Sequence, residues 1–226
     1  KPEGPFKVVK IFRPLSGFYP ENVPATEKTT DIGPYPFDFV FDGGSIPMHA
    51  DSLKIYKRDL HVGKMVRDMT LFVDDNEKAY HIYSSEENST LHIAELTDDY
   101  LGYTGRYKRF FPGRFNEAPI VFKDKGKYYL IASGCTGWAP NAGRSAYARD
   151  ILGEWTEMKN PFMGNDANIS FNSQGACFFR EGNNLIYIGD RWNPNNPVDA
   201  RYIWLPITID KHQPVIRWLD KWSMTD

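Results

Sequence analysis

The stretch EAPIVFKDKGKYYLIASG, residues 117–134, decides the expected fold because the chain repeats its pattern twice more. RDMTLFVDDNEKAYHIYSS covers residues 67–85, and SQGACFFREGNNLIYIGD covers residues 173–190. Each copy reads as two short apolar strands joined by a turn, which is the pattern of a β-hairpin. Self-similarity at a roughly fixed period indicates a repeat architecture built from β-strands.

Each copy opens on a polar residue at the start of its first expected strand: Asp68, Glu117 and Gln174. The spacing between these residues is 49 and then 57 positions. A phenylalanine follows each of them four or five positions later: Phe72, Phe122 and Phe179. The three copies therefore share the same strand start as well as the same hairpin.

Further strand candidates follow the hairpins. They are TLHIAEL (90–96) after the first, RSAYARD (144–150) and GEWTEM (153–158) after the second, and RYIWLPITI (201–209) and PVIRWL (214–219) after the third. Four strands in about 50 residues is the period of a β-propeller blade. We therefore expect an all-β chain made of propeller blades.

Propeller geometry gives the leading polar residues a meaning. The innermost strand of every blade runs along the central axis, so the strand starts meet on one face. We expect Asp68, Glu117 and Gln174 to surround one pocket there, although they lie far apart in the sequence. The alternative, that they are solvated strand starts with no joint role, stays open on the sequence alone.

The composition excludes some functions and leaves others open. The chain has 226 residues and a formal net charge of −2, which disfavours a nucleic-acid-binding protein with a basic surface. No run of about 18 apolar residues occurs, so we expect no membrane span. Aromatic residues make up 15% of the chain, which suits either a carbohydrate site or a β-rich core.

The cysteines, the histidines and the glycosylation sequons give little information about function. Cys135 and Cys177 form no CxxC pair and are expected to be free thiols. The five histidines show no metal-ligand spacing. Asn88-Ser89-Thr90 and Asn168-Ile169-Ser170 are formal glycosylation sequons, although such triplets often occur by chance.

The domain organisation is expected to be simple. We predict a single, partial β-propeller domain over residues 1–226, with an insertion between blades over residues 16–64. The insertion is rich in Pro, Gly and Thr and shows little periodicity. Loops of this length are uncommon unless they are functional or disordered. Because the insertion precedes the expected inner strand that carries Asp68, it could wall one side of the pocket.

Several motifs together resemble a known family. RDMTLFVDD (67–75), PGRFNEAP (112–119), SGCTGWAPN (133–141) and GDRWNPNNP (189–197) resemble the exo-β-1,3-galactanase branch of glycoside hydrolase family 43. The likeness covers most of residues 67–218, and GPFKVVKIFRP (4–14) fits as well. The insertion is similar to one in a neighbouring subfamily. This resemblance implies a five-bladed β-propeller, an inverting mechanism and a site on the propeller axis.

The resemblance also implies roles for individual residues. Glu117 matches the general acid of that branch, and Gln174 matches the residue proposed to assist the attacking water. Asp68 matches an aspartate that contacts the substrate or tunes the acid. Thr136 matches a residue of the sugar pocket. An ordinary amide is a very poor base, so we expect Gln174 to hold the water in line.

Other candidates for substrate binding come from their positions. Trp138 and Asn141 follow Thr136 in the same loop and are candidate pocket walls. Arg191 and Trp192 follow the third hairpin and are candidate lining residues, although core packing is an equal alternative for Trp192. No cofactor is expected. A calcium ion near the axis, as in some members of the wider family, stays open because the sequence shows no clear ligand set.

The chain should hold about three blades plus the end of another, so about two N-terminal blades of a five-bladed propeller would be missing. An open propeller exposes strand edges, which invite pairing or aggregation. We therefore expect the missing blades, or a partner chain, to complete the domain, and low stability for the chain alone. The resemblance suggests a secreted or periplasmic bacterial protein.

The leading functional interpretation is an inverting exo-glycosidase that removes a terminal sugar, with β-1,3-linked galactose as the expected sugar, from galactan or arabinogalactan. Related subfamilies leave α-L-arabinofuranosidase, β-galactofuranosidase or β-xylosidase activity as alternatives. A non-catalytic carbohydrate-binding propeller is an alternative from another class. A platform for protein interaction is a third, and polar residues on the axis weigh against it.

Overall fold

The computed structural model describes residues 3–29 and 54–224, so residues 30–53 of the expected insertion lie outside the described residues. The described chain is all-β, with little helix. Within residues 3–29 and 54–224, the helices are one turn of α-helix, α1 (Ile55–Arg58), and the short 3-10 helices η1 (Ala25–Glu27), η3 (Ala167–Ile169) and η4 (Pro197–Asp199). Within these residues, no helix is long and apolar enough to cross a membrane.

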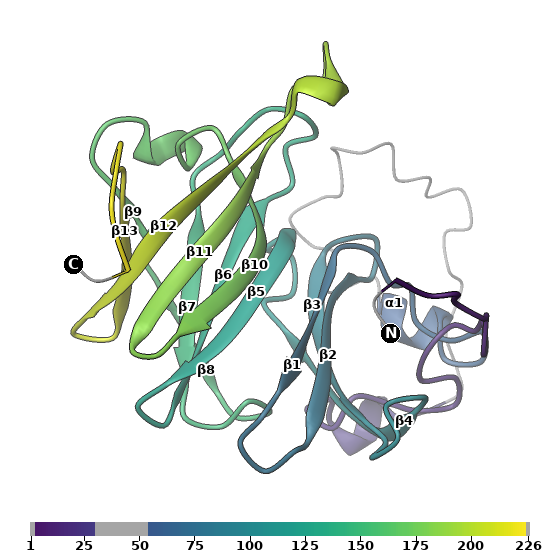
Figure 1. Cartoon of the computed structure of the whole chain (residues 1–226). Helices are drawn as coiled ribbons and strands as arrows, with labels where there is room; N and C mark the ends of the chain where they lie inside the picture. Colours follow the sequence, from purple (N-terminus) through teal and green to yellow (C-terminus); the bar gives the residue numbers. More distant parts are fainter. Residues whose placement is uncertain (1–2, 30–53, 225–226) are drawn as a thin grey trace.

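The strands form three sheets (Figure 1). The first sheet holds β1 (Met69–Val73), β2 (Ala79–Ser85), β3 (Thr90–Leu96) and β4 (Tyr103–Phe110). The second holds β5 (Asn116–Asp124), β6 (Lys127–Gly134), β7 (Arg144–Ala148) and β8 (Trp155–Met158). The third holds β10 (Gln174–Glu181), β11 (Asn184–Arg191), β12 (Arg201–Asp210) and β13 (Gln213–Arg217), with β9 (Phe162–Met163) added in parallel to β13. Within each sheet, the consecutive strands pair antiparallel in chain order.

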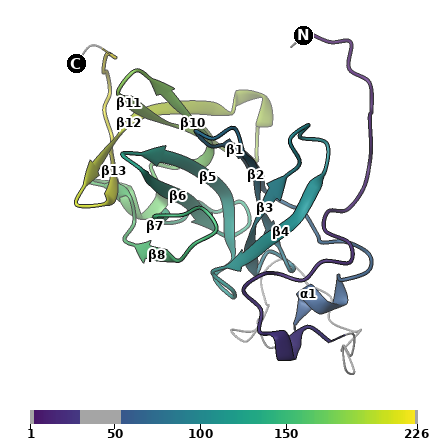
Figure 2. The same cartoon turned by 90° about the horizontal axis from the view of Figure 1, so that it is seen from below.

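The three predicted hairpins are confirmed as the first two strands of the three sheets. Their first strands, β1, β5 and β10, gather in the middle of the molecule, while β4, β8 and β13 lie toward its outside (Figure 2). Strand β5 contacts both β1 and β10. The inner strand of the second sheet therefore lies between the inner strands of the other two.

The core explains this arrangement. Successive side chains of a strand point to opposite faces, and the second sheet is apolar on both. Ile120 and Phe122 of β5 join the core that it shares with the third sheet. Val121 between them, together with Tyr128 and Leu130 of β6, joins the core that it shares with the first sheet. The apolar runs of β5 and β6 thus place the second sheet between two others.

Both β5 and β10 carry a β-bulge close to their start, between Glu117 and Ile120 and between Gly175 and Cys177. A bulge inserts an extra residue and changes the phase of the side chains that follow. Phe178 of β10 points toward the second sheet and stacks on Phe122 of β5, with ring centroids 4.9 Å apart. Phe179, the residue that the repeat singles out, instead points to the other face and is 39% exposed.

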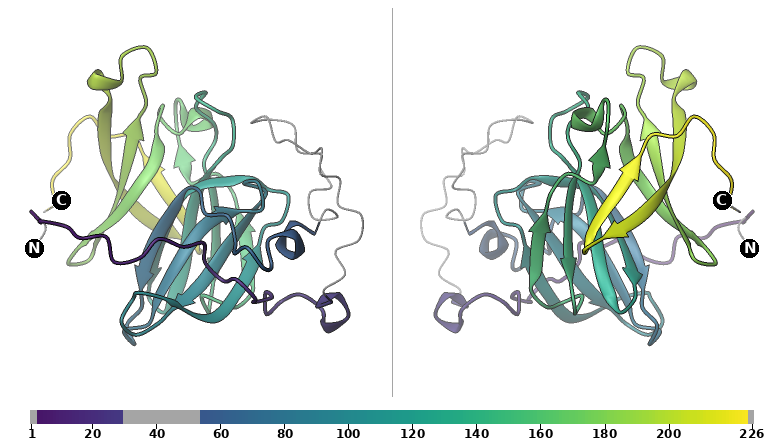
Figure 3. Two further views of the ribbon diagram at one scale, coloured as in Figure 1. Left: turned by 90° about the vertical axis from the view of Figure 1, so that its right-hand side faces the viewer. Right: turned by 90° about the vertical axis from the view of Figure 1, so that its left-hand side faces the viewer.

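The described parts of the insertion lie against the outer strand of the first sheet. Asn22 exchanges two hydrogen bonds with the backbone of Arg109 in β4, at 2.7 and 3.0 Å. The stretch SLKIYKRDL (52–60), which has no clear pattern in the sequence, contains α1, whose Ile55 and Tyr56 are buried. Glu21 and Asn22 cover the edge of β4 through hydrogen bonds to the backbone of Tyr107 and Arg109. The sequence did not predict strand β4. Figure 3 shows the chain before Leu15 running past the first sheet as an extended segment.

We predict that Gly175→Ala destabilises the fold, because a Cβ there would lie 2.7 Å from Cδ1 of Ile120 and 3.3 Å from the carbonyl oxygen of Ala118. Overpacking of this kind costs about 1–3 kcal/mol. Chemical unfolding monitored by circular dichroism measures the change. Gly102→Ala is the control, since a Cβ there meets Thr97 at an ordinary 3.4 Å. Equal midpoints for the two variants would show that β10 and β5 are not in close contact at Gly175.

Candidate active site

The structure brings the three leading polar residues together at one end of the inner strands. Oδ2 of Asp68 accepts a hydrogen bond from the backbone N–H of Ala118, the residue after Glu117, at 3.1 Å. Glu117 is paired across the hairpin with Ser133. Nε2 of Gln174 donates to Oγ of Ser133 at 2.9 Å. Asp68 and Gln174 thus contact the second sheet on either side of Glu117.

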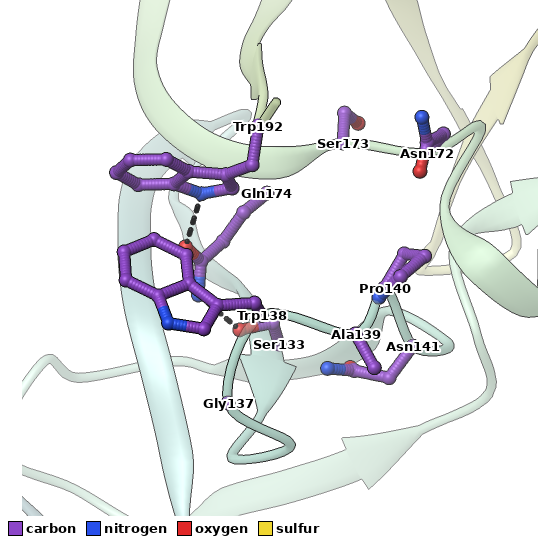
Figure 4. A pocket seen from close by; sticks show the side chains of 10 residues that line it. All are labelled: Ser133, Gly137, Trp138, Ala139, Pro140, Asn141, Asn172, Ser173, Gln174 and Trp192. Carbon is purple, nitrogen blue, oxygen red and sulfur yellow. Dashed lines mark hydrogen bonds between the residues drawn. The ribbon is translucent and has the colours of Figure 1, made fainter. Parts of the chain in front are cut away.

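A chain of hydrogen bonds orients Gln174 (Figure 4). The indole N–H of Trp192 donates to Oε1 of Gln174 at 3.0 Å, and Ser133 in turn donates to the carbonyl oxygen of Glu117 at 3.4 Å. An indole N–H is a donor only, so the Gln174 atom that faces it must be the amide oxygen. The bonded partners therefore fix the orientation of the amide. Its oxygen keeps a second lone pair for another donor.

A hollow opens beside Gln174, which we call the tryptophan cavity. It encloses about 390 Å³, part of it open to solvent, and is lined by Ser133, Trp138, Pro140, Asn172, Gln174 and Trp192, among others. The rings of Trp138 and Trp192 meet edge to face, with centroids 5.2 Å apart, on one side of the cavity (Figure 4). Two exposed indoles beside polar amides are a suitable lining for a sugar, which has apolar faces and hydroxyl edges.

Glu117 does not itself line this cavity, but it is half-buried and pairs across the hairpin with Ser133, which does line it. Burial raises the pKa of its carboxyl group above the ordinary value. A contact with the thiol of Cys135 lowers it, the negative charge of Asp68 raises it, and the positive charge of Arg67 lowers it. The net shift is upward, so Glu117 holds its proton to a higher pH than an exposed glutamate. A glutamate in this state can act as a proton donor.

Asn88 contacts Glu117, although the sequence did not predict a role for Asn88 at this site. Its Nδ2 donates to Oε1 of Glu117 at 2.9 Å, and its Oδ1 is buried without a hydrogen-bond partner within the described residues. Asn88 ends the turn between β2 and β3, where Glu86, Glu87 and Asn88 all have positive φ. The formal sequon is therefore a buried turn in contact with Glu117, a poor acceptor for a glycan. Only the preference of Asn for turns with positive φ was visible in the sequence.

The turn is held by a buried ionic cluster. The carboxylate of Glu86 accepts hydrogen bonds from Nε of Arg109 at 2.5 Å and from Nε2 of His92 at 2.8 Å. Burial alone would raise the pKa of Glu86, but these hydrogen bonds and charges lower it to about 2. Burial lowers the pKa of His92, so its ring is neutral, with the proton on the nitrogen that faces Glu86. This anchor positions Asn88 two residues later.

The other predicted binding residues fall into two groups. Trp138, Asn141 and Trp192 line the tryptophan cavity. The side chain of Asn141 is largely used inside its own loop, where it accepts from N–H of Gly134 at 2.8 Å and donates to Oγ1 of Thr136 at 2.7 Å. Thr136 donates to the carbonyl oxygen of Ala139 at 2.6 Å and holds the loop closed. Arg191 lines a different, neighbouring hollow.

Residues 16–29 and 54–64 of the insertion do not line the tryptophan cavity. The described residues also include no group of three or more His, Cys, Asp or Glu side chains that could hold a metal ion.

Comparison with known proteins agrees with this geometry. The model of the glycosyl hydrolases family 43 matches residues 50–190. A solved GH43 β-1,3-galactosidase, with galactodeoxynojirimycin, is 43% identical over 99% of this chain, with a TM-score of 0.91. The chain belongs to glycosyl hydrolase family 43. No curated protein matches it.

Two further relatives are exo-β-1,3-galactanases. The enzyme from Clostridium thermocellum is 34% identical over 70% of this chain, with a TM-score of 0.62. The enzyme from Phanerochaete chrysosporium, solved with β-1,3-galactotriose, is 33% identical over 68%, with a TM-score of 0.62. This family 43 chain spans 66% of the β-1,3-galactosidase and 34% and 36% of the two galactanases. The relatives are thus longer than the part that matches.

We predict that Asp68→Asn lowers the pKa of Glu117, because it removes a negative charge that disfavours a second ionisation nearby. The amide can still accept the hydrogen bond from Ala118, so the backbone should not move. A ¹³C NMR titration of the glutamate carboxyl groups measures the pKa. Asp98→Asn, at an exposed position, is the control. An unchanged titration of Glu117 in the Asp68 variant would show that burial alone sets its pKa.

Proposed function

We propose that this chain carries the acid and water-positioning half of an inverting exo-glycosidase site. The observation that carries the proposal is the joint position of Glu117 and Gln174 at Ser133, beside the tryptophan cavity. One group is a carboxyl with a raised pKa, and the other is an amide whose orientation is fixed. The carboxyl group and the amide can play different chemical roles, and they lie on β5 and β10, two strands that contact each other.

Glu117 is the proposed general acid. Hydrolysis of a glycosidic bond needs a protonated carboxyl group at the leaving oxygen, and a second group that activates or places water on the opposite face of the sugar. Because burial and Asp68 favour the protonated form, Glu117 is suited to give that proton. Activity should therefore fall as the pH rises through the raised pKa of Glu117.

Gln174 is the proposed positioning group for water. An amide oxygen accepts a hydrogen bond but takes no proton at neutral pH, so its contribution is to hold the water in line. Oε1 already accepts from Trp192, and its remaining lone pair can accept from water. Asp68 contacts the backbone next to the acid and acts through the pKa of Glu117.

The proposed product is a terminal β-1,3-linked galactose, released from the end of galactan or arabinogalactan. The similar structures are a β-1,3-galactosidase and exo-β-1,3-galactanases, one of them with β-1,3-galactotriose bound. The exposed indoles of Trp138 and Trp192 are suited to cover the apolar face of a galactose ring. A polysaccharide substrate of this kind also fits a secreted or periplasmic protein.

The three sheets are proposed as blades of a five-bladed propeller in a single domain, with residues 16–64 as an insertion. Apolar side chains are exposed at both ends of the row of sheets: Met69 and Leu71 on the first, and Tyr202 and Trp204 on the third. Faces of this kind mark surfaces that another element covers. Further blades, from the same polypeptide or from a partner chain, would cover them and complete the site.

We expect Glu117→Gln to lower the rate of galactose release from a β-1,3-galacto-oligosaccharide by about 10²–10⁴-fold, because proton donation is lost. Calorimetric binding of the oligosaccharide should remain. ¹H NMR of the reaction reports the released sugar and its anomeric form at once, and inversion predicts α-galactose as the first product. Glu181→Gln, at the far end of β10, is the control. Sugar binding with no release by the unchanged protein would favour a non-catalytic binding domain.

We also expect Trp192→Phe to lower kcat by up to about tenfold, the equivalent of one hydrogen bond. The substitution keeps an aromatic ring in the cavity but removes the N–H that orients Gln174. KM should change less than kcat, since the ring still covers the sugar. Trp204→Phe is a matched control, because Trp204 is equally exposed, at 49%, and lies outside the cavity. A change in KM alone would assign Trp192 to sugar contact only.

A further inference from the structure

A second hollow lies next to the tryptophan cavity, at the ends of β11 and β13 in the third sheet. Its lining includes Asp166, Phe171, Asn172, Arg191, Arg217 and Trp218. We call it the arginine hollow. It encloses about 850 Å³, part of it open to solvent, which is more than twice the volume of the tryptophan cavity. The proposed hydrolysis of a terminal galactose uses none of its charged groups.

Two guanidinium groups line this hollow, those of Arg191 and Arg217. Within the described residues, neither Arg191 nor Arg217 forms an ion pair or a side-chain hydrogen bond. Asp166 lines the same hollow but makes no ion pair with either of them. A guanidinium carries a fork of donors that matches a carboxylate, and it is always charged. The hollow therefore has free positive charge in the form that best recognises a carboxylate.

Trp218 supplies a flat apolar wall beside these charges. Its indole N–H donates to Oδ1 of Asp220 at 2.8 Å, and Phe171 packs edge-on against the ring at 5.7 Å between centroids. The guanidinium of Arg191 lies 5.6 Å from the centroid of the same ring. The ring is thus fixed in orientation, yet it remains 43% exposed. A fixed, exposed indole next to a guanidinium suits a sugar ring that carries an acid group.

The two hollows are adjacent. Asn172 lines both of them, and it stands two residues before Gln174. Arg191 in the arginine hollow directly precedes Trp192 in the tryptophan cavity. A ligand whose terminal sugar occupies the tryptophan cavity can therefore place a neighbouring sugar or a branch in the arginine hollow. The arrangement fits one extended saccharide better than two separate ligands.

We propose that the arginine hollow binds a uronic acid residue of the saccharide substrate, with its carboxylate on Arg191 and Arg217 and its ring on Trp218. This inference rests on the proposed function for the identity of the saccharide, and it makes the substrate an acidic galactan. Selectivity arises because a neutral sugar leaves the two guanidinium groups without a partner.

The test compares two ligands by calorimetry: β-1,3-galactotriose, and the same trisaccharide with one glucuronic acid branch. The acidic ligand should bind about tenfold or more tightly, as expected for charge-assisted hydrogen bonds. The double substitution Arg191→Gln with Arg217→Gln should remove this preference, so that the two ligands bind the variant with equal affinity. Arg149→Gln is the control of equal charge type, because Arg149 follows β7 at the opposite end of the sheets.

A second measurement uses the unchanged protein. The preference for the acidic ligand should shrink as sodium chloride is raised, because salt screens exposed charges. Equal affinity for the two ligands would overturn the inference while galactose release still upholds the proposed function. Equal competition by inorganic phosphate or free glucuronate would also overturn it, by showing a general anion site. Preferential binding of the acidic ligand without any galactose release would uphold the inference and reject the proposed function.

Discussion

The burial of both faces of the second sheet is the constraint on which the rest of the molecule depends. Strands β5 and β6 each have a continuous apolar run, over residues 118–122 and 128–132, so neither face of the second sheet can be left in water. Ile120 and Phe122 need one neighbour, and Val121 needs the other. The first and third sheets supply these neighbours, and as a result β1 and β10 come to lie beside β5. The meeting of three strand starts follows from this packing.

Polar contacts between sheets then fix the strand starts against one another. Ser84 of β2 is buried, and its hydroxyl donates to the carbonyl oxygen of Asn116 at 2.7 Å. Asp68 accepts from Ala118, and Gln174 donates to Ser133. A buried polar group without a partner costs about 1–3 kcal/mol, so a slip of one sheet past another would break several of these bonds at once. The alignment of Glu117 with Gln174 is thus set by the sheets and not by loops.

The sequence predicted the parts of this structure that depend on local pattern. The three hairpins, and Asp68, Glu117 and Gln174 at their starts, followed from apolar runs and turn residues. The sequence could not predict the contact of Asn88 with Glu117, since that contact joins a turn of the first sheet to a strand of the second. The bulges near Glu117 and Gly175 also went unseen, because a bulge depends on the partner strand and on close packing against a neighbour. Phe178, and not Phe179, packs on Phe122, because Phe178 lies on the face of the third sheet that meets the second sheet. Thr136 and Asn141 were placed in the right loop, but their bonding within it depends on backbone geometry that no motif shows.

Two glutamates near the same turn have opposite electrostatics, and this difference suits the proposed chemistry. Glu86 is ionised, because Arg109 and His92 lower its pKa to about 2 in spite of burial. The stability that it contributes is present above its unfolded pKa and is lost only as the pH falls through about 2. Glu117 has a raised pKa, so its charged form is the disfavoured one, and folding loses stability as the pH rises through that pKa. Between the pKa of Glu86 and the raised pKa of Glu117, the carboxylate of Glu86 stays charged while the carboxyl group of Glu117 keeps its proton. A proton donor can then be held in place by an ionic cluster that does not titrate in the same pH range.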